Sequence, residues 1–319
     1  MRRELYAAPL RSLVTALVVF TAACWPSAQT VAQSTEVAWL ERAPELFVSA
    51  GEALSEVSAA LPERPETLLL DARSVEDFAA LTVRGSRNVP WQRLVDGERS
   101  GRLIDDPAEL AQRLAGLAAP GDDIVVFGGW AGTNPLNAWG EEGRLWWSLK
   151  SAGYLSVRVV YGGFAALTDA GAPTGPGIQT VVESNTPIPS LSPSARWRAN
   201  AEQVASVSAG AGAVLDTRTR LEFAGATLYG EREGGHIAGA TLLWWRDVFA
   251  SERDLLSPDD LDALLQSHGA ARDEPLVAYC TGGIRSAFVV MLASALGYDA
   301  RNYDGSIWEW TNELQRPLE

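Results

Sequence analysis

Cysteine is scarce in this chain, which has only Cys24 and Cys280 among its 319 residues. Cys24 lies in an N-terminal segment that we expect to be removed, so the finished protein would keep one thiol and could form no internal disulfide. A single thiol left over in an oxidising compartment is a candidate for reactivity. Histidine is equally rare, and His236 and His268 show no carboxylate–histidine spacing. The sequence therefore predicts no metal site.

Positive charge is also in short supply. The chain has 26 Lys and Arg against 40 Asp and Glu, which gives a formal net charge of −14. Nucleic acids and anionic membranes are bound through basic patches, so we expect neither as a partner. Apolar residues make up 47% of the chain, which is enough for globular cores. The length predicts about two domains.

The chain begins with an apolar run that is too short to span a bilayer comfortably. Arg2, Arg3 and Arg11 precede this run, which extends from Leu13 to Ala23 and is followed by small residues. A basic start, a short apolar stretch and small residues are typical of a cleaved export signal. We therefore expect an exported protein, most simply a periplasmic one, with no stable membrane insertion after cleavage.

Two positions fit the end of this signal. We interpret residues 1–32 as the signal peptide and the start of the mature chain, with cleavage after Ala28 or Ala32. A lipid anchor on Cys24 is the weaker alternative. The segment before it resembles a bacterial lipoprotein box, but Thr21 replaces the usual leucine.

The remaining thiol stands in a glycine-rich loop between a predicted strand and a predicted helix. The loop reads Cys280, Thr281, Gly282, Gly283, Ile284, Arg285. Its backbone N–H groups and the helix N-terminus favour the thiolate, which is the reactive form of cysteine. The glycines permit the backbone turns, and Arg285 could bind an anionic substrate bidentately. A packing cysteine would need neither feature, although a lone cysteine is more often a small buried hydrophobe.

The sequence contains an internal repeat. In each half a short apolar strand ends in Asp-x-Arg before a helix start, at residues 68–73 and 214–218. A later pair of apolar strands, 124–128 and 276–280, also corresponds. Alternating strands and helices of this kind predict two α/β units, each with a mainly parallel sheet flanked by helices.

The two halves differ where chemistry would occur, because Gly128 takes the position of Cys280. The distance from Gly128 to Gly153 is 25 residues, whereas Cys280 to Gly297 is 17, so the first half has a loop eight residues longer. Without a nucleophile the first half is interpreted as structural or substrate-shaping. The longer loop contains Trp130, Asn134, Pro135, Trp139, Glu141 and Glu142.

A segment rich in Pro, Gly, Ser and Thr separates the halves at residues 172–196. We interpret it as a linker that lies extended over the surface. The predicted domains are therefore residues 36–171 and residues 197–319, the second containing the cysteine loop.

Three ordered motifs in the second half carry a family resemblance. They are Asp216–Arg218 followed by Glu222–Phe223 and Gly235–Ala240, the loop Cys280–Arg285, and Tyr303–Trp310. Together they resemble the signatures of tandem-domain rhodanese-family sulfurtransferases of the thiosulfate or 3-mercaptopyruvate type. The resemblance implies two rhodanese-like domains, of which the first is inactive and the second catalytic.

The resemblance also implies a mechanism and a site. Cys280 would attack a small anionic sulfur donor, become a persulfide and pass sulfur to cyanide or a thiol, with no metal or organic cofactor. Thiosulfate is the leading donor and 3-mercaptopyruvate the runner-up. The residues expected to bind substrate are Thr281, Gly282, Gly283, Ile284, Arg285 and Trp308.

Two alternatives remain open. Phosphatases of the same fold use a loop one residue longer between cysteine and arginine, so the loop Cys280–Arg285 favours sulfur over phosphate. A non-catalytic sulfur-carrier or binding module is possible in this family, although the retained cysteine favours an enzyme. Glu222 departs from the family pattern, because two-domain enzymes often place a substrate-binding arginine there.

Other polar and aromatic residues receive structural interpretations. Asp216 and Arg218 are expected to form a buried ion pair, and His236 to be a structural turn residue. We expect residues 244–246, Trp-Trp-Arg, to line the pocket mouth, with Arg246 as an anion contact.

Overall fold

The computed structural model describes residues 28–59, 67–97, 100–130, 139–178, 188–210 and 212–319. The expected signal segment up to residue 27, with Cys24, lies outside the described residues, as do Asn134 and Pro135 of the longer loop. Within the described ranges, no helix combines the length and the apolar character needed to cross a bilayer.

The first unit is built on a five-stranded sheet whose strands all run parallel. In spatial order they are β1 (Phe47–Val48), β6 (Val157–Val160), β5 (Asp123–Phe127), β2 (Thr67–Asp71) and β4 (Arg87–Asn88). The helices of this unit are α2 (Ala50–Ala59), α3 (Val75–Ala80), α4 (Pro107–Leu114), α5 (Glu141–Ala152) and α6 (Gly163–Asp169), with a 3-10 turn η1 (Trp91–Leu94).

The second unit repeats this plan with four parallel strands. Their order is β11 (Asp299–Asn302), β10 (Pro275–Tyr279), β8 (Ala213–Asp216) and β9 (Thr241–Leu242). Its helices are α7 (Ala201–Ala209), α8 (Arg220–Phe223), α9 (Pro258–Ser267) and α10 (Ile284–Ala295), with 3-10 turns η2 (Ala195–Trp197) and η3 (Trp245–Val248) and a π-helical turn η4 (Trp308–Glu313). The predicted fold class, two α/β units with mainly parallel sheets flanked by helices, is confirmed.

The sheets form from apolar runs because both of their faces are covered. In the first unit Leu68 and Leu70 of β2 pack into the core on the α5 side, whereas Leu69 belongs to the core formed with α2 and α6. Polar caps begin the helices. Asn200 and Gln203 form a reciprocal capping box on α7, and Ser257 caps α9 directly before a proline.

The first part of the predicted linker belongs to the first unit. Its residues Thr174–Gly175 form β7, which pairs antiparallel with β3 (Thr82–Val83). Further on, Ser194 N–H donates to the Ser151 carbonyl at 2.8 Å. Residues 174–175 and Ser194 of this connection therefore contact the first domain.

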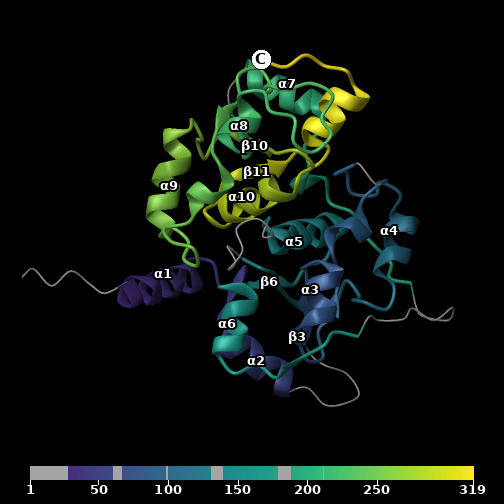
Figure 1. The fold of residues 1–319 in the computed structure, drawn as a ribbon, viewed down its shortest axis with the longest axis vertical. Helices are drawn as coiled ribbons and strands as arrows, with labels where there is room; N and C mark the ends of the chain where they lie inside the picture. The colour runs from purple at the N-terminus through teal and green to yellow at the C-terminus, as the bar shows by residue number, and fades with distance from the viewer. Residues whose placement is uncertain (1–27, 60–66, 98–99, 131–138, 179–187, 211) are drawn as a thin grey trace, which may run out of the picture.

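The two units meet through α5 and α10, the equivalent helices of the two halves (Figure 1). Glycine allows this close packing, because a Cβ built at Gly143 would lie 2.5 Å from the Cα of Phe288. The N-terminal helix α1 (Ala28–Arg42) also reaches the second unit, where Trp39 Nε1 donates to the Leu256 carbonyl at 2.8 Å. One apolar core consequently runs through both units.

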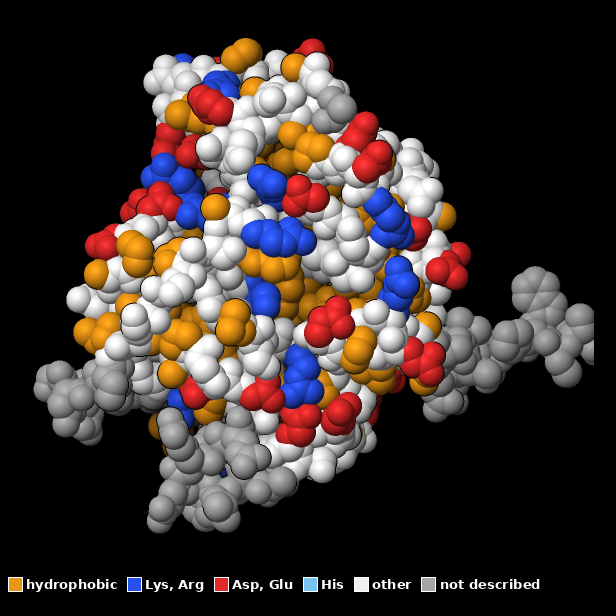
Figure 2. All heavy atoms as spheres, turned by 180° about the vertical axis from the view of Figure 1, so that it is seen from behind, with side chains coloured by type: hydrophobic (Ala, Val, Ile, Leu, Met, Phe, Trp, Pro, Cys, Tyr) orange, Lys and Arg blue, Asp and Glu red, His pale blue; other side chains and the backbone are white. Residues whose placement is uncertain are grey.

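The surface has no broad basic area on the face shown in Figure 2. Lys and Arg side chains there are scattered among Asp and Glu side chains. Several basic side chains are held in ion pairs between segments distant in sequence, such as Arg158 with Glu56 and Arg198 with Asp105.

Candidate active site

Cys280 lies between the end of β10 and the start of α10, at the carboxyl edge of the parallel sheet. Its side chain is buried, and Sγ accepts a hydrogen bond from Gly283 N–H at 3.1 Å. Gly283 precedes α10 with φ of 77°, and a Cβ there would meet Asp304 Cα at 2.6 Å. Glycine is therefore required both by the backbone conformation and by the space, and it places an N–H group on the sulfur.

The environment of Cys280 favours the thiolate. Burial alone would raise the pKa of the thiol, but the Arg285 charge and hydrogen bonds from Ser286 and Gly282 outweigh it and lower the pKa below its ordinary value. A helix N-terminus and a ring of amides act in the same direction. The loop can hold negative charge on the sulfur without a metal ion.

Arg285 is occupied by a partner within the protein. Its two terminal nitrogens donate to the two carboxylate oxygens of Glu222 at 2.9 and 2.8 Å, and Nη2 also donates to Thr281 Oγ1 at 2.8 Å. Burial is outweighed by these bonds, which lower the pKa of Glu222 to about 2. The sequence predicted that the Arg285 guanidinium binds an anion bidentately. In the structure the anion that it binds in this way is the Glu222 carboxylate.

Aromatic rings cover the same guanidinium on other sides. Its central carbon lies 5.5 Å from the ring centre of Trp139 and 5.8 Å from that of Tyr229. The two rings meet edge to face at 5.6 Å. Arg285 is thus held by a carboxylate and two ring faces, and its side chain is only 4% exposed.

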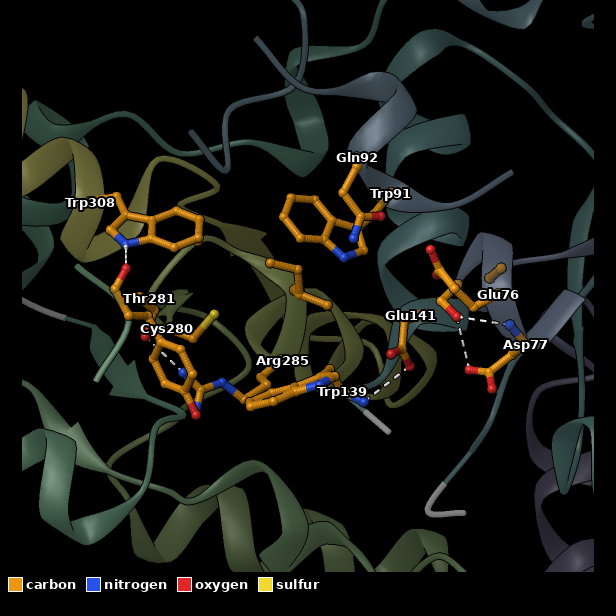
Figure 3. Close-up of a pocket in the computed structure, with 15 residues that line it drawn as sticks. Glu76, Asp77, Trp91, Gln92, Trp139, Glu141, Cys280, Thr281, Arg285 and Trp308 are labelled. Atoms are coloured by element: carbon orange, nitrogen blue, oxygen red, sulfur yellow. Dashed lines mark hydrogen bonds between the residues drawn. The ribbon is translucent and has the colours of Figure 1, made fainter. Parts of the chain in front are cut away.

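A cavity of about 480 Å³ opens at Cys280, with walls from both domains (Figure 3). The second domain contributes Tyr229, Cys280, Thr281, Gly282, Ile284, Arg285 and Trp308. The first domain contributes Ala72, Ser74, Glu76, Asp77, Trp91, Gln92, Trp139 and Glu141. The only described nucleophilic thiol therefore lies in a cleft that neither domain forms by itself.

Glu141 belongs to the wall from the first domain and is nearly buried. One carboxylate oxygen accepts the Trp139 N–H at 3.0 Å. Burial, only partly offset by hydrogen bonds, raises the pKa of Glu141 to about 7, so its charge changes near neutral pH. Trp139 and Glu141 both come from the longer first-half loop and the helix start behind it, which supports the substrate-shaping interpretation of that half.

Arg144 of α5 connects the first domain to the catalytic loop. Its guanidinium is fully buried and donates to the carbonyl of Gly283 at 3.1 Å and to that of Gly101. Burial lowers the pKa of Arg144 to about 10, and its charge attracts the Cys280 thiolate. A cation from the first domain therefore stabilises both the loop backbone and the charge on its sulfur.

The expected substrate-binding residues lie together. Thr281, Gly282, Ile284, Arg285 and Trp308 line the cavity, and Gly283 contributes its N–H group behind the sulfur. Trp308 is fixed by its Nε1, which donates to the Tyr229 carbonyl at 3.0 Å.

The expected contribution of residues 244–246 to the pocket mouth is wrong. Trp245 is buried in the core against Phe249 and Phe288, and Trp244 lines a different hollow beside α8. None of the three residues lines the cavity at Cys280. The η3 turn directs Trp245 toward the domain core instead.

The remaining structural interpretations agree with the geometry. Arg218 and Asp216 form a buried ion pair at 2.6 Å. His236 stacks on Phe223 with ring centres 3.7 Å apart and lies outside the cavity lining. Gly297 follows the C-cap of α10 with φ of 89°, a left-handed conformation that commonly ends helices.

Sequence reasoning missed Tyr229, Trp91, Glu76, Asp77 and Arg144. Tyr229 and Trp91 lie in irregular segments or short turns with no spacing that points to a site. Arg144 lies in α5 and belongs to no motif that the sequence singles out. The sequence signal for this side of the cavity was the longer first-half loop. It contains Trp139 and Glu141, to which no sequence motif assigns a role.

The first half has a region structurally equivalent to the Cys280 loop. Both α5 and α10 follow a glycine with φ of 77°, so Glu142 takes the helix position of Arg285. A Cβ built at Gly128 would overlap the Glu142 carboxylate. Burial and the Glu141 charge raise the pKa of Glu142 to about 8. The place of a nucleophile is thus filled, and the cation that would stabilise it is replaced by an acid.

Comparison with known proteins places both halves in one family. Residues 53–170 and 200–313 match the model of the rhodanese-like domain. SseB of Mycobacterium tuberculosis is 32% identical over 179 residues, which cover 55% of this chain and 61% of that protein, less than two thirds of its length. The thiosulfate sulfurtransferase of Azotobacter vinelandii is 28% identical over 269 residues, or 80% of this chain and 92% of that protein.

Solved structures share the fold at lower identity. The anaerobic ergothioneine biosynthesis enzyme of Chlorobium limicola aligns with a TM-score of 0.75 at 19% identity, covering 86% of this chain and 70% of the other. SseA of Escherichia coli, a 3-mercaptopyruvate sulfotransferase, aligns with a TM-score of 0.67 at 20% identity, covering 82% and 98%.

Proposed function

The chain belongs to the rhodanese-like domain family, and from that premise we propose that its second domain is a sulfurtransferase. It would move sulfane sulfur from thiosulfate through a persulfide on Cys280 to cyanide or a thiol. The single observation that carries the proposal is the Cys280 sulfur, which has a lowered pKa and accepts a hydrogen bond from Gly283 N–H at the floor of an open cavity.

The chemistry requires no external oxidant. The Cys280 thiolate attacks the outer sulfur of thiosulfate, a new S–S bond forms on Cys280, and sulfite leaves with the electron pair of the broken bond. In the second step an acceptor nucleophile attacks the outer sulfur of the persulfide, and Cys280 leaves as a thiolate. Backbone amides of the loop stabilise both anionic forms of the sulfur, as preorganised donors do in other active sites.

The paired Glu222 and Arg285 have a positioning role in this scheme. Glu222 caps α8 through Thr219 and binds both Arg285 and Thr281. The pair therefore ties the loop to α8, while the Arg285 charge still lowers the pKa of the Cys280 thiol. The first domain, with Gly128 and Glu142 at the equivalent place, shapes the cavity and does not transfer sulfur.

The alternative donor is 3-mercaptopyruvate, and the alternative role is a sulfur carrier without turnover. The relatives include proteins named for each donor. Steady-state kinetics with both donors distinguishes them, since the physiological donor should have the higher kcat/KM. A carrier would load sulfur stoichiometrically without multiple turnovers. Hydrolysis of a phosphate ester without sulfur transfer would favour the phosphatase reading.

The direct test is sulfur loading. After thiosulfate treatment, the purified protein should carry about one equivalent of cyanolysable sulfur, and Cys280→Ser should carry none while it keeps the same thermal midpoint. Cys24→Ser, prepared in protein that keeps its N-terminal segment, is the matched control and should load like the original protein. Undiminished loading or turnover in Cys280→Ser would end the proposal.

We also propose that the N-terminal segment directs export to the periplasm and is then removed. The support is the basic and apolar N-terminal sequence, with cleavage after Ala28 or Ala32. Cell fractionation with N-terminal mass determination tests it. A mature protein that begins at Cys24 with an added lipid mass would instead favour the lipoprotein reading, and an uncleaved cytoplasmic protein would refute export.

A further inference from the structure

The cavity at Cys280 has two chemically different ends. The inner end is the catalytic loop, whose amide groups favour negative charge on the sulfur. The outer end comes from the first domain and includes Glu76, Asp77 and Glu141. Figure 3 shows these three carboxylates together on the side of the cavity away from Cys280. A substrate that fills the cavity therefore extends from an anion-stabilising floor to an acidic rim.

No cation in the described part of the chain balances this rim. Glu76, Asp77 and Glu141 form no ion pair with any described residue; Asp77 accepts the Ser74 hydroxyl and Glu141 a backbone N–H. The one basic residue of the described lining is Arg285, whose terminal nitrogens are committed to Glu222. The rim consequently repels an anionic head group and attracts a cationic one.

Aromatic side chains add to this preference. Trp91, Trp139, Tyr229 and Trp308 line the same cavity. The faces of Trp139 and Tyr229 already hold one cation, the Arg285 guanidinium, at 5.5 and 5.8 Å. Aromatic faces beside carboxylates are the chemistry that recognises ammonium and quaternary ammonium groups. A cavity of about 480 Å³ also has room for a much larger acceptor than cyanide.

We propose that the acceptor which takes sulfur from Cys280 is a small thiol with an ammonium or quaternary ammonium group, held at the outer end of the cavity by aromatic rings and carboxylates. This rests on the proposed sulfur transfer. The acceptor thiolate attacks the outer sulfur of the Cys280 persulfide. The bond from that sulfur to Sγ breaks, an acceptor persulfide forms, and Cys280 returns to the thiolate. The electron count is balanced without an added oxidant or reductant.

The binding test uses three thiols with the same two-carbon spacing between sulfur and head group. They are 2-(trimethylammonio)ethanethiol, 2-mercaptoethanol and 3-mercaptopropionate, titrated calorimetrically into Cys280→Ser protein, which cannot react through this sulfur. The cationic thiol should bind at least about tenfold more tightly than the anionic one, since cation–π and carboxylate contacts each contribute a factor of a few. Equal or tighter binding of 3-mercaptopropionate would overturn the inference.

Charge reversal at the rim tests the location. Glu76 is exposed and its side chain forms no ion pair or hydrogen bond with a described residue, so Glu76→Lys should fold normally. It should reduce the preference for the cationic thiol by about tenfold, because attraction becomes repulsion. Glu52→Lys is the matched control, since Glu52 is an exposed acid of α2 outside the cavity lining. An equal loss in both variants would assign the effect to net charge and refute the site.

Sulfur loading of the original protein separates this inference from the proposed function. Protein that binds the cationic thiol but takes up no cyanolysable sulfur would overturn the sulfurtransferase proposal and leave the cation site standing. Loaded protein should pass its sulfur faster to the cationic thiol than to 3-mercaptopropionate, compared at equal thiolate concentration. Protein that loads sulfur and discharges it to both at the same rate would retain the function and overturn the inference.

Discussion

Replacing Glu142 with glutamine should make the unfolding free energy much less dependent on pH between 5 and 9. The Glu142 side chain is fully buried and forms no ion pair with a described residue, and backbone N–H groups of Glu142 and Trp130 offset its burial only in part. Burial and the neighbouring Glu141 charge raise its pKa to about 8 from an ordinary value of 4.5. The folded protein therefore holds a proton at neutral pH that the unfolded chain has released.

The sign and size follow from this proton. A carboxyl whose pKa is raised by folding contributes stability that is present below pH 4.5 and is lost as the pH rises to 8. A pKa difference of 3.5, at about 1.4 kcal/mol per unit, sets a total loss of about 5 kcal/mol, of which about 4 kcal/mol falls between pH 5 and pH 9. Glutamine keeps the shape of the side chain and has no such proton equilibrium.

Urea unfolding followed by tryptophan fluorescence at pH 5, 7 and 9 measures the effect. The unfolding free energy of Glu142→Gln minus that of the original protein should increase by about 2–4 kcal/mol from pH 5 to pH 9. The control is Glu45→Gln, at an exposed position, which should follow the original protein throughout. If Glu142→Gln also runs parallel to the original protein over this range, the argument for a buried, protonated carboxyl is refuted.

Three further outcomes are expected. Glu222→Gln should lower the unfolding free energy at pH 7 by about 3 kcal/mol, because it leaves the buried Arg285 cation uncompensated. Hydrogen bonds from Arg285 outweigh burial and lower the pKa of Glu222 to about 2. Urea unfolding should therefore show that the original protein loses this advantage as the pH falls from 4.5 toward 2. Arg144→Gln should raise the pKa of the catalytic thiol by roughly 0.5–1, measured from the pH profile of iodoacetamide alkylation, with partial rescue by Arg144→Lys; an unchanged profile contradicts the electrostatic role. Gly283→Ala should abolish sulfur loading and cost more than 2 kcal/mol by the same urea assay, since the new Cβ meets backbone. Gly85→Ala, with a similar positive φ and open space, should cost only about 1 kcal/mol, and equal costs would refute the steric argument.

The catalytic loop could be predicted because its determinants are adjacent in sequence. Two glycines after a cysteine, followed by an apolar helix, define a tight turn that directs N–H groups toward the sulfur. The structure has this arrangement, with α10 beginning at Ile284 and Gly283 N–H on Cys280 Sγ. The repeated alternation of apolar strands and helices likewise predicted the parallel sheets. In the structure β8 pairs with β10 in the same register as β2 pairs with β5.

The partner of Arg285 could not be predicted in the same way. Glu222 lies 63 residues earlier, in a different helix. It contacts Arg285 only because α8 packs beside the loop that contains Cys280. The sequence showed an acid where relatives often have a basic residue, but not that this acid would bind the loop arginine. Similarly, the aromatic run at residues 244–246 contained no signal that the η3 turn would direct Trp245 into the core.

The amino-acid sequence by itself determined the two parallel α/β units, the position of the glycine-rich cysteine loop and the absence of a cysteine from the equivalent place in the first half. These properties depend on apolar periodicity, on glycines at turns and on the identity of one residue, all of which are local. Only the tertiary structure decided what surrounds the sulfur. The packing of α5 against α10 brings Arg144, Trp139 and Glu141 of the first domain to the loop that contains Cys280. Contacts between domains depend on the shapes of two folded surfaces, and no spacing along a single chain specifies them.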